Sequence, residues 1–170
     1  MLQPMLALLL ALSSSPSRAE PVPDDYNADV VATFHLASTP EAVTTVVSDL
    51  RAQEALLAGC TRKWEHGSLS QGVGANASLI YTVGAWRRKL TGTITQVEPG
   101  RRVIVDHAGK KGFITTWTVT GTSGGADVEL RTLLNLPPKP FRKLYVNKIQ
   151  GRWQACYAEA LVKLENSLPR

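Results

Sequence analysis

Apolar and polar residues alternate along most of the chain between residues 29 and 136, which is the pattern of strands that bury one face. The first such stretch, 29–38, has one apolar face made of Val30, Ala32, Phe34 and Leu36. After Gly59 the same alternation returns in six further stretches, at 60–66, 75–83, 88–97, 102–107, 113–120 and 126–136. Turn residues separate these stretches, so they predict an antiparallel meander with one polar face.

Helical patterns occur at three places. Thr39-Pro40-Glu41 provides an N-cap, a proline at the first helical position and an acid in the first turn. A second short helix is expected over 51–58, ending at Gly59. From Phe141 to Leu168 apolar residues recur with the helical period over about 28 residues. The pattern predicts an α+β fold in one domain over 29–168, with a seven-stranded antiparallel sheet wrapped around a long C-terminal helix and two short helices after the first strand.

The first nineteen residues have the features of a signal peptide. Met5 to Leu12 is unbroken apolar sequence, too short for a membrane span, and Ser17-x-Ala19 fits a signal-peptidase site. We therefore expect a signal peptide over 1–19, a polar lead over 20–28 and a soluble protein exported to the periplasm or the medium. The alternative is a buried N-terminal helix.

Composition limits the chemistry. The chain has 170 residues, 44% of them hydrophobic, with three His and two Cys, so one ordinary domain without a zinc site or other cofactor is expected. We interpret Cys60 and Cys156 as small buried thiols, although export also permits a disulfide.

Neither a nucleotide nor a nucleic acid is an expected partner. Residues 72–77 match a loose nucleotide-binding pattern, but they open a strand, so no nucleotide is expected. The net charge is +5, yet expected export argues against nucleic acid as a partner.

Three phrases carry a resemblance to a known superfamily: FHLASTPEAVTTVVSDL at 34–50, GVGANASLIYTVG at 72–84 and LTGTITQVEPGRRVIV at 90–105. With the order of elements, they resemble the START-like (SRPBCC) superfamily of helix-grip proteins, which includes polyketide cyclases/dehydrases, lipid-transport proteins and coenzyme Q-binding domains. Thr44 departs from the pattern, because many relatives have Trp there. The resemblance implies a ligand cavity between the sheet and the C-terminal helix. Members bind sterols, other lipids, quinones or polyketides, and some are enzymes.

Side chains on the helix-facing side of the sheet would line such a cavity, and an ordinary filled core is the alternative. They are Phe34, Leu79, Tyr81, Leu90, Ile94, Val105, His107, Phe113, Thr115, Trp117, Leu130, Thr132, Leu134, Tyr145, Ile149 and Trp153. Among them His107 is the candidate acid or base. Asp106 points to the opposite face, so we expect His107 to be a hydrogen-bonding pocket residue rather than a catalyst. His35 should face outward, and the place of His66 is left open.

Alternate turns of a meander fall at the same end of the sheet, and here they gather basic and aromatic residues. This basic rim consists of Trp86, Arg87, Arg88, Lys110, Lys111, Lys139, Arg142 and Lys143, with Phe113 and Phe141 beside it. By the resemblance, this end is the cavity mouth. Such a rim suits anionic lipid head groups or an anionic membrane surface, whereas a merely solubilising surface is the alternative.

These observations predict an exported binding or carrier protein for an apolar small molecule such as a lipid, a quinone or a polyketide-like compound. One alternative is a cyclase- or dehydrase-like enzyme that uses His107 as base, with Tyr81 or Tyr145 as hydrogen-bond donors. The other is a membrane-surface or interaction module with a filled core.

Overall fold

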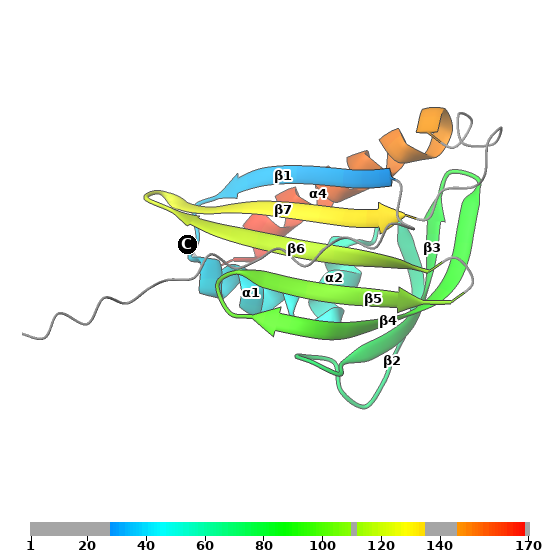
Figure 1. Cartoon of the computed structure of the whole chain (residues 1–170), viewed down its shortest axis with the longest axis horizontal. Coiled ribbons are helices and arrows are strands. Elements are labelled where there is room, and N and C mark those ends of the chain that lie inside the picture. The colour runs from blue at the N-terminus through cyan, green and yellow to red at the C-terminus, as the bar shows by residue number, and fades with distance from the viewer. Residues whose placement is uncertain (1–27, 110–111, 135–145, 169–170) are drawn as a thin grey trace, which may run out of the picture.

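The structure is a computed structural model that describes residues 28–109, 112–134 and 146–168. Seven strands, two short helices and a C-terminal helix preceded by one π-helical turn make up this part of the chain (Figure 1). In chain order the elements are β1 (Ala28–Leu36), α1 (Pro40–Val47), α2 (Leu50–Leu56), β2 (Thr61–His66), β3 (Asn76–Val83), β4 (Trp86–Glu98), β5 (Arg102–Ala108), β6 (Phe113–Thr122), β7 (Gly125–Leu134), η1 (Val146–Gln150) and α4 (Gly151–Ser167).

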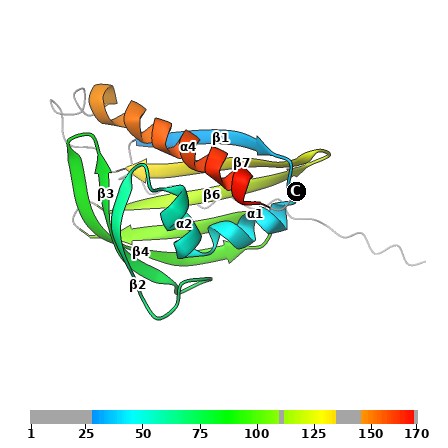
Figure 2. The same ribbon diagram turned by 180° about the vertical axis from the view of Figure 1, so that it is seen from behind.

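The strands form one antiparallel sheet in the order β1-β7-β6-β5-β4-β3-β2. Strands β2 to β7 therefore pair with their neighbours in sequence, and β1 joins the sheet beside β7. Figure 2 shows the sheet curling around α4, with α1 and α2 against the same face. The predicted helix-grip α+β fold and the order of its elements are confirmed.

Burial alternates along the strands as the sequence predicts. On β3, Ala77, Leu79, Tyr81 and Val83 are buried, and the side chains between them are partly exposed. β6 and β7 show the same alternation over most of their length. The buried face of each strand packs toward the three helices, so the core lies inside the curl of the sheet.

The start of α1 follows the capping residues in the sequence. Thr39 Oγ1 accepts a hydrogen bond from the amide of Ala42 at 3.3 Å, and Pro40 occupies the first helical position. Thr44 is buried, and its hydroxyl accepts a hydrogen bond from the amide of Gly100 at 2.9 Å. Thr44, where the sequence departs from the resembled family, thus fixes the β4–β5 turn against α1.

The end of α2 differs from the prediction. α2 begins at Leu50 and ends at Leu56 with Leu57 as its C-cap, so Gly59 is not the capping residue. The amides of Cys60 and Thr61 both donate to the carbonyl oxygen of Leu57, at 2.9 Å each. These two bonds turn the chain into β2 before the helix can reach Gly59.

The C-terminal helix is less regular than the predicted single helix over 141–168. Residues 141–145 lie outside the described part of the chain, Val146–Gln150 forms a π-helical turn, and Leu168 follows α4 in an extended conformation. The buried stripe is also wider than predicted, since Tyr157 and Leu161 are fully buried. No helix in the described ranges has the length and apolarity needed to cross a membrane.

Cys60 and Cys156 form a disulfide, with their Cα atoms 6.0 Å apart. Our interpretation of them as free thiols is therefore wrong, although both residues are buried as expected. The bond joins the turn after α2 to α4 across 96 positions of sequence. Sequence spacing alone cannot place two such residues within bonding reach.

Candidate functional site

Most of the predicted cavity residues do face the interior between the sheet and α4. The buried ones are Leu79, Tyr81, Leu90, Ile94, Val105, His107, Phe113, Thr115, Trp117, Leu130, Thr132, Leu134 and Trp153. Phe34 and Ile149 are partly buried and pack against this core, and Tyr145 lies outside the described residues. That these side chains line an open ligand cavity stays a prediction.

An aromatic cluster occupies the end of this interior where α4 begins. The ring of Tyr81 lies 5.3 Å from that of His107, 5.0 Å from Phe113 and 5.6 Å from Trp153, measured between centroids. Trp86, which the sequence places on the rim, is half-buried and lies 4.9 Å from Trp153. The five rings come from β3, β4, β5, β6 and α4, so this cluster depends on the closed fold.

A group of neutral polar side chains lies beside the aromatic cluster. The hydroxyls of Thr115 and Thr132 are hydrogen-bonded at 2.8 Å, and Thr132 is also hydrogen-bonded to the hydroxyl of Tyr157. Burial raises the pKa of Tyr157, and burial followed by the proximity of Tyr157 raises the pKa of Tyr81 well above its ordinary value. Both phenols therefore stay protonated at neutral pH.

The sequence analysis missed Tyr157. Trp153 and Cys156 were assigned to the inward face of the C-terminal helix, but Tyr157, which lies on the same face, was not included. Its four-residue spacing from Trp153 is the signal that would have found it, because residues at this spacing share a helix face.

Several buried polar atoms in this interior have no hydrogen-bond partner within the described part of the chain. They are both ring nitrogens of His107 and the indole nitrogen of Trp117, whereas the hydroxyl of Tyr81 and the indole nitrogen of Trp153 lie beside the hydroxyl of Tyr157. Buried polar side chains in native proteins are satisfied in the large majority of cases. Such atoms on β5 and β6 are left without a hydrogen-bond partner from the described part of the chain.

His107 is the one buried side chain among the Asp, Glu, Lys, Arg and His residues that the structure describes. Burial lowers its pKa to about 3, so the imidazole is neutral at physiological pH. Asp106, next to it in sequence, is exposed on the opposite face, as expected. No carboxylate in the described ranges orients the ring, which distinguishes this histidine from those of catalytic dyads and triads.

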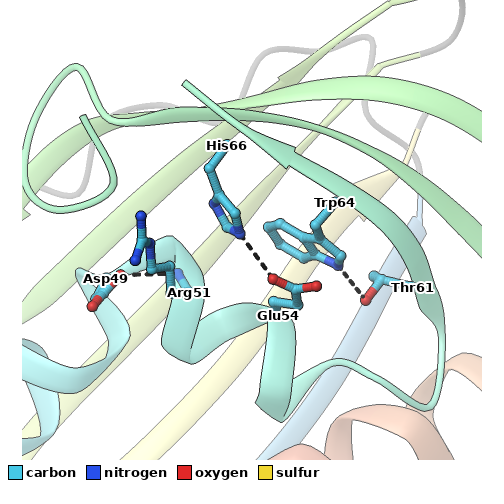
Figure 3. A network of polar contacts seen from close by, with 6 residues as sticks. All are labelled: Asp49, Arg51, Glu54, Thr61, Trp64 and His66. Carbon is cyan, nitrogen blue, oxygen red and sulfur yellow. Dashed lines mark hydrogen bonds and ion pairs between the residues drawn. The ribbon is translucent and has the colours of Figure 1, made fainter. Parts of the chain in front are cut away.

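The other two histidines lie outside this interior. His66 Nε2 is 2.8 Å from a carboxylate oxygen of Glu54, and its ring stacks on that of Trp64 with centroids 5.8 Å apart (Figure 3). The indole nitrogen of Trp64 donates to Thr61 Oγ1 at 3.0 Å. These contacts tie β2 to α2. On the outer face, exposed His35 pairs with Asp127 at 2.7 Å.

A shallow hollow of about 510 Å³ lies on the outer face of β1, β6 and β7, on the side of the sheet away from the helices. It is open to solvent and separate from the interior described above. Its lining residues are Thr33, Phe34, His35, Thr118, Thr120, Asp127, Val128 and Glu129.

The described part of the basic rim surrounds the β3–β4 turn. Arg87 is exposed, and the guanidinium of Arg88 lies 5.5 Å from the centre of the Trp86 ring. Arg152 of α4 lies against this turn, because a Cβ atom placed on Gly84 would be 3.1 Å from a guanidinium nitrogen of Arg152. Lys148 lies one helical turn before Arg152. The remaining predicted rim residues, Lys110, Lys111, Lys139, Arg142 and Lys143, lie outside the described residues.

Comparison with known proteins agrees with this geometry. The model of the polyketide cyclase / dehydrase and lipid transport family matches residues 27–168, and the chain belongs to that family. It therefore has the START-like fold that the sequence resembled. No functionally curated protein matches the chain.

Solved structures share the fold at low sequence identity. The KanY protein, solved by NMR, is 21% identical with a TM-score of 0.70, covering 82% of this chain and 95% of its own. Protein TTHA0849 from Thermus thermophilus is 17% identical with a TM-score of 0.66, at the same two coverages. Protein CV1439 from Chromobacterium violaceum is 20% identical with a TM-score of 0.54, covering 85% of this chain and all of its own.

Proposed function

We propose that this chain is an exported binding or carrier protein for an apolar small molecule, such as a lipid, a quinone or a polyketide-like compound. The ligand is held between the curled sheet and α4. The observation that carries the proposal is an interior of apolar side chains that also buries unpartnered polar atoms on His107 and Trp117. An apolar pocket with a few placed polar groups is the usual composition of a small-molecule site.

Two features support export. The sequence at 1–19 has the pattern of a signal peptide, and the fold contains the Cys60–Cys156 disulfide. Disulfides persist mainly in oxidising compartments such as the periplasm and the extracellular space.

The experiment that tests the proposal is native mass spectrometry of the chain purified with its disulfide intact, followed by solvent extraction of bound molecules. We expect a discrete additional mass that is apolar and leaves in organic solvent. A clean unliganded mass, with no binding from panels of lipids, quinones and aromatic ketones, would contradict a carrier function. N-terminal sequencing of the exported product checks the cut after Ala19.

A cyclase- or dehydrase-like enzyme is the alternative within the same family. In that case neutral His107 acts as the base and Tyr81 as a hydrogen-bond donor. The absence of an orienting carboxylate near His107 in the described part of the chain favours binding over catalysis. Replacing His107 by Phe separates the two: a carrier keeps most of its binding, whereas an enzyme loses about 10²- to 10⁴-fold in turnover.

We also propose that the basic end of the molecule contacts anionic membranes. Arg87, Arg88, Lys148 and Arg152 surround half-buried Trp86 at the end of the interior where α4 begins. Cations around an aromatic side chain are typical of surfaces that contact lipid head groups. A carrier with this end on a membrane would take up or release its ligand there.

A further inference from the structure

Charged residues divide the exposed face of α4 into a basic half and an acidic half. Lys148 and Arg152 are exposed where the helix begins, and Glu159 and Glu165 are exposed in its second half. Lys163, which pairs with Glu159 at 2.8 Å, is the one basic residue of that second half. The face is therefore positive at one end and negative at the other.

This distribution of charge opposes the dipole of the helix. Acidic residues near the N-terminus of a helix and basic residues near its C-terminus stabilise it. α4 has no acidic residue in its first turn and no basic residue in its last turn, whereas Arg152 lies in the first turn and Glu165 in the last. These charges do not stabilise the isolated helix, but a second helix that runs in the opposite direction would compensate them.

The middle of the same face is uncharged and uncovered. Figure 2 shows α4 crossing the surface of the molecule, with the sheet behind it and no described element in front of it. The residues along this line are Gly151, Ala155, Ala158 and Val162, and all four are exposed. A helix that faces only water normally has polar or charged residues here.

The spacing of these four residues is that of a contact between two helices. They recur at intervals of four, three and four residues, as do the positions that face the partner in a coiled coil. Let Ala155 of one copy lie beside Ala158 of another copy in an antiparallel pair. Gly151 then faces Val162 of the second copy, so that the smallest residue of the line meets the largest.

The same arrangement brings opposite charges together. On one flank of the pair, Arg152 lies beside Glu159 of the second copy. At the end of the contact, Lys148 lies beside Glu165 of the second copy. Two-fold symmetry makes each of these contacts twice. In a parallel pair each charge would instead meet its own kind, so the charges select the antiparallel arrangement.

We propose that the exposed face of α4 binds the same face of a second copy of this chain, antiparallel, in a two-fold symmetric dimer. The inference does not depend on what the interior binds. One helix pair is a small contact compared with the roughly 800 Å² per partner of standard complexes. We therefore expect a reversible dimer with a dissociation constant of about 10–100 μM.

Sedimentation equilibrium of the mature chain with its disulfide intact measures the association. The dimer should weaken as salt is added, because salt screens the charge pairs. Glu159→Lys/Glu165→Lys leaves the basic end unchanged and should weaken association at least about tenfold. The control Glu65→Lys/Asp106→Lys makes the same change of charge at exposed sites elsewhere and should stay within about twofold of the wild type.

A reciprocal variant tests the pairing directly. Lys148→Glu/Arg152→Glu reverses the other half of the face and should also fail to dimerise alone. An equimolar mixture of the two reversed variants should associate at least as tightly as the wild type, because all the pairs again join opposite charges. Both reversals follow the helix dipole, so neither should prevent folding, which circular dichroism checks.

A wild type that stays monomeric at about 1 mM would overturn the inference and leave this face to another partner or to water. A dimer that Glu159→Lys/Glu165→Lys does not weaken would mean that the copies meet elsewhere. Equal weakening by the control would assign the effect to net charge. A mixture of the reversed variants that stays monomeric would equally refute the antiparallel pairing.

Discussion

Two side chains at the centre of the interior, His107 and Trp117, are large, buried and polar, and their ring nitrogens have no hydrogen-bond partner in the described part of the chain. Such groups lower the stability of the unliganded fold, because burial removes their hydrogen bonds to water. Retaining them is understandable if a bound molecule supplies the missing bonds. At the scale of the residue, function and stability therefore make opposite demands.

The pH dependence of stability should report the burial of His107. Its pKa is about 3 in the folded protein and near 6.5 in the unfolded chain, so only the unfolded state takes up a proton between these values. The free energy of unfolding should therefore be highest above pH 6.5 and fall as the pH decreases toward 3, by at most about 1.4 kcal/mol per pH unit from this group.

Urea unfolding at pH 7.5 and pH 4.5 checks this dependence. His107→Leu should lose less stability than the wild type between the two values, because it removes the group that titrates. His35→Gln alters an exposed histidine and serves as the control. If His107→Leu and the wild type lose stability equally, the imidazole is not buried as described.

Gly92 on β4 gives the His107 ring its space. A Cβ atom at this position would lie 3.1 Å from His107 Nδ1 and 3.4 Å from a methyl group of Val105. Since Tyr81 and Phe113 enclose the ring, it cannot move away freely. Gly92→Ala should therefore destabilise the protein by about 1–3 kcal/mol in urea unfolding.

The matched control for Gly92→Ala is Gly151→Ala. Gly151 lies at the start of α4, and a Cβ atom there would meet no neighbouring side chain or strand within 4 Å, so alanine should stabilise by about 0.5–1 kcal/mol. A Gly92→Ala variant as stable as the wild type would show that the ring has room to shift.

At the scale of the element, period and capping residues predicted most of the fold. The alternation on β3 assigned the correct side chains to the interior, and Thr39-Pro40 placed the start of α1. The predicted ends of the helices were less accurate, because contacts between elements determine where a helix begins and ends. The carbonyl of Leu57 ended α2 early, and the π-helical turn before α4 has no signature in the residue pattern.

The candidate site could be predicted only in part. Most inward-facing residues followed from the period of two, because a strand fixes which side each residue faces. The convergence of Tyr81, Trp153 and Tyr157 did not follow, because it depends on how α4 is rotated against the sheet. Nor did the disulfide, because it depends on how α4 approaches the turn after α2.

The disulfide should contribute strongly to the stability of the closed fold. It fixes α4 to the turn after α2, and its sulfurs join residues 96 positions apart. Closing a loop of this size stabilises by about 4.7 kcal/mol in the chain-entropy description, and by less if the native state is strained. The wild type should therefore unfold at lower urea concentration after addition of a reductant.

The double variant Cys60→Ala/Cys156→Ala controls for the reductant itself. Its unfolding midpoint should already be low and should not respond to reductant. An unchanged midpoint of the reduced wild type, with two free thiols verified by alkylation, would contradict a stabilising role for this bond.

At the scale of the whole molecule, basic side chains gather at the end of the sheet where α4 begins. Arg87, Arg88, Lys148 and Arg152 lie at the end where α4 begins, and no acidic residue occurs in the sequence between 66 and 97 or between 130 and 158. This end should therefore bind anionic vesicles, with each cation contributing about 1 kcal/mol near the surface.

Co-sedimentation with vesicles containing phosphatidylserine measures this binding. Replacing the four cations by serine should weaken binding at least about tenfold, and raising the salt concentration should weaken binding of the wild type. The control carries the same loss of charge at exposed sites elsewhere: Arg51, Arg62, Lys63 and Arg101. Equal losses in the two variants would mean that net charge, rather than this end, attracts the vesicles.

The position of β1 beside β7 also sets the timing of folding. β1 is the first strand of the sheet to be made and its partner β7 is the last strand, so His35 can pair only with an Asp127 that lies 92 positions later. Contacts between such distant residues form slowly, because a long loop has to close before they stabilise anything. During synthesis β1 therefore has no strand to pair with until β7 has been made. The sheet can close around α4 only after almost the entire chain has left the ribosome.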